Sequence, residues 1–136
     1  MRRGLVIAGI LLAGVVWGQA THRSLKMTDA QVQQFYEADS DAYFEGELPH
    51  ADVRFVHNLR DDNGDALMGL TQGPPFQISL TDRYQDNGSI SIMTLHHEEC
   101  HAALSAKNVE ELDVHGPAFQ TCMVRLAEAG AFKGIW

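Results

Sequence analysis

Apolar positions recur at helical spacing early in the chain and in short strand-like runs further along. A Thr-x-x-Gln capping pattern begins at Thr28. Val32, Phe35 and Tyr36 continue an apolar stripe that predicts a helix ending near residue 46. Three short apolar runs separated by turn-forming residues then predict strands over residues 53–59, 66–71 and 76–80. We expect the strands to pair as a small antiparallel sheet. The aspartate-rich segment 61–65 should form a solvated hairpin turn.

A second helical stripe follows the predicted sheet. Its members, spaced at i, i+4, i+7, i+8 and i+11, are Met93, His97, Cys100, His101 and Leu104. Ser89 or Ser91 is expected to cap the start of this helix, which should end near Asn108. A closing helix is expected from residue 115 or 116 to residue 129, where Gly130 ends it. This order predicts an α+β fold with an N-terminal helix, a small three-stranded antiparallel sheet, a motif-bearing helix and a C-terminal closing helix.

The motif-bearing helix contains the pattern H-E-x-x-H. On a helix, His97 and His101 lie on one face about one turn apart, as two ligands of a shared zinc ion must. Glu98 is rotated by about 100° from His97, so its carboxylate can reach a zinc-activated water without being a ligand. The pattern predicts a zinc hydrolase. An alternative pairs His96 with Cys100, but that register would put a histidine where the water-activating carboxylate is needed.

A catalytic zinc site normally holds three protein ligands and leaves the fourth position for water. The favoured third ligand is His115, because Gly116 permits a turn that folds a loop ligand back onto the metal. Glu110 and Glu111 are the alternatives, since either would complete a site with two histidines and one glutamate. Asp113 is more plausible as a hydrogen-bond partner of a ligand histidine.

Three segments resemble the SprT-like (Spartan-like) zinc metallopeptidase family, in the same order and at similar spacing across residues 28–130. They are Tyr43-Phe44-Glu45-Gly46-Glu47-Leu48-Pro49, Thr94-Leu95-His96-His97-Glu98-Glu99-Cys100-His101-Ala102 and His115-Gly116-Pro117-Ala118-Phe119. The resemblance implies a zincin-like fold, with Zn²⁺ held by His97, His101 and His115 and with Glu98 as general base. It also implies hydrolysis of peptide bonds. Position 99 departs from the family, which usually has an apolar residue there.

The charge balance indicates which partners to expect. The formal net charge is −8, and it becomes −10 without the first twenty residues, which carry only Arg2 and Arg3 as charges. No cluster of Lys or Arg follows Arg23, whereas binding to a phosphate backbone requires a basic surface. We therefore expect a protein or peptide substrate and no nucleic-acid partner. The oligomeric state stays open.

The first twenty residues have the pattern of a secretion signal. Arg2 and Arg3 precede an apolar run from Leu5 to Trp17, and small residues come before Thr21. The run is shorter than the roughly 20 residues that span a membrane comfortably, which favours cleavage over retention as a membrane tether. We expect residues 1–20 to be a signal peptide or N-terminal membrane anchor. Residues 21–136 then form a single SprT-like metallopeptidase domain, exported to a periplasmic or extracellular space.

The chain has two cysteines, Cys100 and Cys122. In an oxidising compartment they could join the motif-bearing helix to the closing helix. We favour the other interpretation, in which they are two small buried hydrophobic side chains without a bridge.

Two other functions fit the same residues. An exported zinc amidase acting on cell-wall peptides would use the same metal and the same base. A non-catalytic, zinc-stabilised binding module would use the histidines to hold its fold, and Cys100 or Cys122 would close the fourth metal position. Candidates to stabilise an oxyanion are Tyr84, His57, His96 and Arg125. None has an informative spacing, so each is interpreted as a surface or packing residue.

Overall fold

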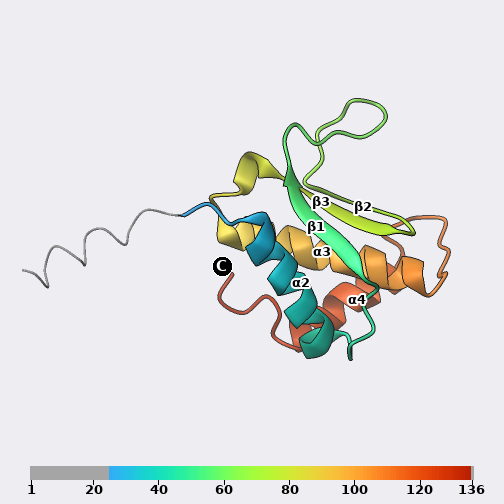
Figure 1. Ribbon diagram of the computed structural model, residues 1–136. Helices are drawn as coiled ribbons and strands as arrows, with labels where there is room; N and C mark the ends of the chain where they lie inside the picture. The colour runs from blue at the N-terminus through green and yellow to red at the C-terminus, as the bar shows by residue number, and fades with distance from the viewer. Residues whose placement is uncertain (1–24, 136) are drawn as a thin grey trace, which may run out of the picture.

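The computed structural model describes residues 25–135, and the expected leader, residues 1–20, lies outside them. In chain order the elements are α2 (Asp29–Tyr43), β1 (Ala51–Val56), β2 (Gly69–Gln72), β3 (Phe76–Thr81), the 3-10 helix η2 (Asp82–Tyr84), α3 (Gly88–Ala106) and α4 (Pro117–Glu128) (Figure 1). This set of helices and strands confirms the predicted α+β class. None of the helices within residues 25–135 is long and apolar enough to cross a membrane.

The starts of the two long helices are fixed by local side chains. The predicted capping box of α2 is confirmed: the Thr28 hydroxyl accepts from the Gln31 N–H at 3.1 Å, and the Gln31 carboxamide oxygen accepts from the Thr28 N–H at 2.9 Å. The predicted cap of α3 is wrong, because Asn87 caps it by accepting from the Ile90 N–H at 3.1 Å. Asn is as good a cap as Ser, so α3 begins earlier than Ser89 or Ser91 would allow.

The sheet is mixed, which corrects the expected all-antiparallel pairing. Its strand order is β1-β3-β2; β3 pairs parallel with β1 and antiparallel with β2. The centre of β3 is its buried run Ile78, Ser79 and Leu80, whereas β1 buries only alternate residues and β2 buries none fully. A strand that is buried along its centre suits the middle of a sheet. The chain therefore passes from β1 at one edge to β2 at the other edge, and β3 then pairs between them.

The connection from β1 to β2 contains the predicted acidic turn. The Leu67 N–H donates to the Leu59 carbonyl at 3.0 Å, and Arg60 and Ala66 form an antiparallel bridge. Inside the turn, the Asp61 carboxylate accepts from the backbone of Asn63 and Asp65. This confirms the solvated hairpin turn, and Figure 1 shows the connection extending away from the body.

One hydrophobic core joins α2 and α3 to the sheet. Its fully buried members include Val32 of α2, Ile78 and Leu80 of β3, and Leu95 of α3. A second cluster around Phe119 packs α4 against α3. Helix α3 therefore lies between the sheet and α4, in contact with both (Figure 1). This central position allows residues on its different faces to meet the sheet, α4 and α2.

The two cysteines are joined, which corrects the expectation of an unbridged pair. Cys100 of α3 and Cys122 of α4 form a disulfide. Both positions face the interface between these helices, as the sequence indicated. The Cys100 side chain is fully buried at this interface.

Candidate metal centre

Helix α3 presents two of the three expected zinc ligands on one face, and the loop before α4 supplies the third. The Nε2 atoms of His97 and His101 lie 3.1 Å apart, and the His115 Nε2 lies 3.1 Å from the first and 3.2 Å from the second. A tetrahedral zinc with bonds of about 2.0–2.1 Å would separate its ligand nitrogens by roughly 3.3 Å. The three imidazoles therefore converge at the spacing that one small cation requires.

The protonation of His97 and His101 favours metal binding. Burial, with the neighbouring His97 and His115 rings, lowers the pKa of His101 to about 4. Burial and His115 also lower the pKa of His97. Neutral imidazoles keep a lone pair for a metal, and neutral imidazole is the form in which histidine binds zinc. The donor set therefore fits the metal that the sequence predicts.

Phe119 of α4 holds the imidazole cluster from one side. Its ring stacks on His101 at 4.5 Å between centroids and meets His97 and His115 at 4.7 and 4.8 Å. The sequence identified Phe119 only as the last residue of the segment His115-Gly116-Pro117-Ala118-Phe119. Contact with all three rings gives it a second role, which is to restrict their rotation.

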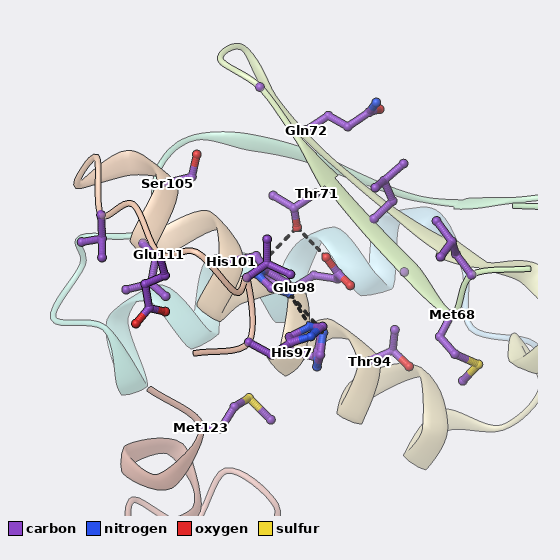
Figure 2. A pocket seen from close by; sticks show the side chains of 18 of the residues that line it. Met68, Thr71, Gln72, Thr94, His97, Glu98, His101, Ser105, Glu111 and Met123 are labelled. Atoms are coloured by element: carbon purple, nitrogen blue, oxygen red, sulfur yellow. Dashed lines mark hydrogen bonds between the residues drawn. The ribbon is translucent and has the colours of Figure 1, made fainter. Parts of the chain in front are cut away.

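Glu98 of α3 points into a cleft that the three imidazoles also line. A hydrogen bond from β2 holds its side chain there. The Thr71 hydroxyl donates to the Glu98 Oε2 at 2.7 Å, and Figure 2 shows these two side chains facing one another above the histidines. Burial raises the pKa of Glu98 to about 7, and the hydrogen bond from Thr71 opposes this rise. Such a carboxyl group can exchange a proton near neutral pH.

Gly69 of β2 leaves the room that Glu98 occupies. A Cβ at position 69 would lie 2.7 Å from the Glu98 Oε1 and 2.9 Å from the Thr94 side chain. A side chain there would displace the carboxylate. Neither Gly69 nor Thr71 could be found from the sequence, because their only link to the motif is the packing of α3 against β2, almost thirty residues upstream.

For the peptidase activity proposed below, replacing Thr71 with valine is expected to lower kcat/KM about 10- to 100-fold, the usual effect of losing a group that orients a reacting side chain. Because the hydroxyl lowers the pKa of Glu98, its loss raises that pKa. The acid limb of the pH profile of kcat/KM should therefore move to higher pH. Thr71→Ser should restore both values, and an unshifted profile in Thr71→Val would contradict this role.

The rival ligands have other positions. Among the described residues, His97, His101 and His115 form a close group of potential ligand atoms that includes neither Glu110 nor Glu111. Glu111 instead accepts from the Ala118 N–H at 2.7 Å, in the first turn of α4. Asp113 accepts from the His115 backbone N–H at 2.9 Å, so it fixes the loop rather than the imidazole.

The alternative pair His96 and Cys100 does not form a site. Cys100 is in the disulfide, and His96 is buried beside Asp39 and Glu99. The four oxyanion candidates also lie elsewhere: none of Tyr84, His57, His96 and Arg125 lines the cleft around Glu98. His57, for example, is exposed and pairs with Asp82 at 3.0 Å.

The cleft itself has a volume of about 1150 Å³. Strand β2 forms one wall, and α3 and the loop before α4 form the others (Figure 2). Much of its lining is apolar, including Leu67, Met68, Leu70, Met93, Leu104, Val109, Val114 and Met123. Such a lining is typical of a ligand-binding cleft.

Fold and site together define an α+β domain with a three-histidine candidate metal centre beside a buried glutamate. A model of the SprT-like family matches residues 32–134. The chain belongs to the SprT-like family, as the three sequence segments indicated. A search of curated proteins found no match. The family and the candidate metal-binding residues are consistent with a metallopeptidase-like domain.

Proposed function

We propose that the chain is a zinc-dependent metallopeptidase that hydrolyses peptide bonds. The observation that carries this proposal is the convergence of three imidazole Nε2 atoms within 3.1–3.2 Å of one another, beside the buried carboxyl group of Glu98. Three imidazoles are a typical catalytic zinc donor set, with a fourth position left for water. His97, His101 and His115 would hold the metal.

Glu98 acts as the general base in this proposal. Zn²⁺ bound by the three imidazoles would lower the pKa of a water molecule toward 7 and polarise the scissile carbonyl. Glu98 accepts one proton from the water as the water oxygen attacks the carbonyl carbon. The same carboxyl group then delivers this proton to the leaving nitrogen as the C–N bond breaks. Thr71 keeps Oε2 fixed throughout, so Oε1 is the oxygen free to exchange the proton.

We also propose that the protein acts outside the cytoplasm. The disulfide between Cys100 and Cys122 supports this, because such bridges persist in oxidising compartments. The leader pattern of residues 1–20 supports it independently and allows a membrane tether if the leader is retained. The acidic net charge of −8 supports a protein or peptide substrate over a nucleic acid.

The same disulfide weighs against a non-catalytic zinc module. In that module Cys100 or Cys122 would close the fourth position of the three-histidine site as a thiolate, and the bridge removes both thiolates. A cell-wall amidase keeps all the features of the proposed site and differs only in substrate.

The purified full-length chain, loaded with zinc, tests these alternatives on unfolded protein and on peptidoglycan fragments. We expect cleavage of the unfolded protein, loss of that cleavage with a chelator and recovery with added Zn²⁺. Release of products from peptidoglycan fragments, without cleavage of the unfolded protein, would favour the amidase over the peptidase. Failure on both substrates by zinc-loaded, folded protein would reject both enzymes.

A further inference from the structure

A second group of metal-binding side chains lies buried on another face of α3. Asp39 of α2 and His96 and Glu99 of α3, here called the buried triad, are 8%, 2% and 0% exposed. The His96 Nδ1 lies 3.0 Å from the Glu99 Oε2 and 3.4 Å from the Asp39 Oδ2. These three residues do not line the cleft around Glu98.

The hydrogen bonds of His96 leave its Nδ1 facing negative charge. The other ring nitrogen, Nε2, lies 3.1 Å from the Ala131 carbonyl oxygen. A carbonyl only accepts, so Nε2 carries a proton and donates it. In the neutral ring Nδ1 therefore has a lone pair, directed toward two carboxylate oxygens. Lone pair and carboxylates repel one another unless a proton or a cation lies between them, and the 3.0 Å contact with Glu99 leaves room only for a proton in the absence of a metal.

The two carboxylates are also incompletely satisfied. The Asp39 Oδ2 and the Glu99 Oε1 are buried without a hydrogen-bond partner. Within residues 25–135, neither carboxylate forms an ion pair with a lysine or arginine. Burying unpaired charge is costly, and native proteins normally pair it or use it to bind a metal. A divalent cation would cancel the two carboxylate charges while leaving His96 neutral.

We propose that the buried triad is a second, structural zinc site. Its three potential ligand atoms lie within 4.8 Å of one another. Zinc bonds of about 2.0–2.2 Å to nitrogen and oxygen separate ligand atoms by roughly 3.3–3.5 Å, close to the spacing around His96. A second oxygen of either carboxylate can fill the fourth position. The site is closed to solvent, as structural zinc sites are.

The consequence of such a site is a link between distant parts of the chain. Asp39 lies on α2, and the Ala131 carbonyl that orients His96 follows α4. The rings of Tyr43 and Phe132 meet the His96 ring edge-on at 6.0 and 5.3 Å. Zinc there would fix the orientation of α3 without touching a substrate.

Zinc content of the purified full-length chain tests the proposal. We expect two equivalents per chain in the wild type and one in Glu99→Gln. The double variant His101→Ala/His115→Ala dismantles the cleft site and should keep one equivalent. This variant separates the two proposals, because its remaining zinc does not depend on peptidase activity. One equivalent in the wild type with none in the double variant would overturn the second site, as would two in Glu99→Gln.

Asp39→Asn and Asp41→Asn provide a matched pair on α2. Asp41 is exposed and lies outside the triad. We expect Asp39→Asn to bind one equivalent and Asp41→Asn to bind two. Thermal unfolding supplies a readout that does not need a triad variant to fold: Zn²⁺ should raise the Tm of His101→Ala/His115→Ala by several degrees. An unchanged Tm would contradict a metal in the buried triad.

Discussion

Replacing Glu98 with glutamine is expected to lower kcat about 10²- to 10⁴-fold while the zinc content stays the same. The amide has the shape of the carboxyl group and can still accept the Thr71 hydroxyl hydrogen bond, so the local packing is preserved. It cannot accept a proton from water. Metal is retained because the three imidazoles, and not Glu98, are the proposed ligands. Turnover of an unfolded protein substrate and metal analysis of the same sample measure both quantities.

The control for this prediction changes the same charge elsewhere. Glu128 of α4 is exposed and lies outside the cleft, so Glu128→Gln should leave kcat within about threefold of the wild type. Loss of zinc together with activity in Glu98→Gln would mean that the carboxylate is a ligand. Full activity in that variant would reject the general-base role.

The parts of the fold that local sequence determines were predictable. Thr28 and Gln31 define the start of α2 through bonds that span three residues, and the i, i+4 spacing of His97 and His101 places both rings on one face of α3. Strand pairing is different. The parallel partner of Ile78 is Val53, and that pairing depends on which strand the core buries in the centre of the sheet. Alternation within each strand carries no information about this order.

The same distinction explains the site. His115 was found from its neighbours in a loop, whereas Thr71 contacts Glu98 across 27 positions of sequence and leaves no local pattern. Glu99 was visible only as a polar residue where an apolar one is usual. Its role can be recognised only from its buried position beside His96 and Asp39, which lie on two different helices. Side chains that orient or neutralise others therefore emerge only from tertiary contacts.

His115→Ala is expected to weaken zinc binding at the cleft site by about 100-fold or more. Loss of a residue that merely orients a ligand typically costs 10- to 100-fold, and His115 is itself a proposed ligand. Its Nε2 lies within 3.1–3.2 Å of the other two, so its removal opens one corner of the site to water. Competition with a chromogenic chelator of known affinity measures this change in the folded, full-length variant.

Glu111→Ala is the matched comparison, because Glu111 lies in the same loop, lines the same cleft and was the rival ligand. Its carboxylate accepts from the Ala118 N–H at 2.7 Å, and Gly116 offers α4 no capping side chain. The variant should therefore lose about 0.5–2 kcal/mol of stability, as a lost helix cap does, while zinc affinity changes less than about threefold. Equal losses of zinc affinity in Glu111→Ala and His115→Ala would overturn the ligand assignment, since only a metal shared by both side chains predicts that result.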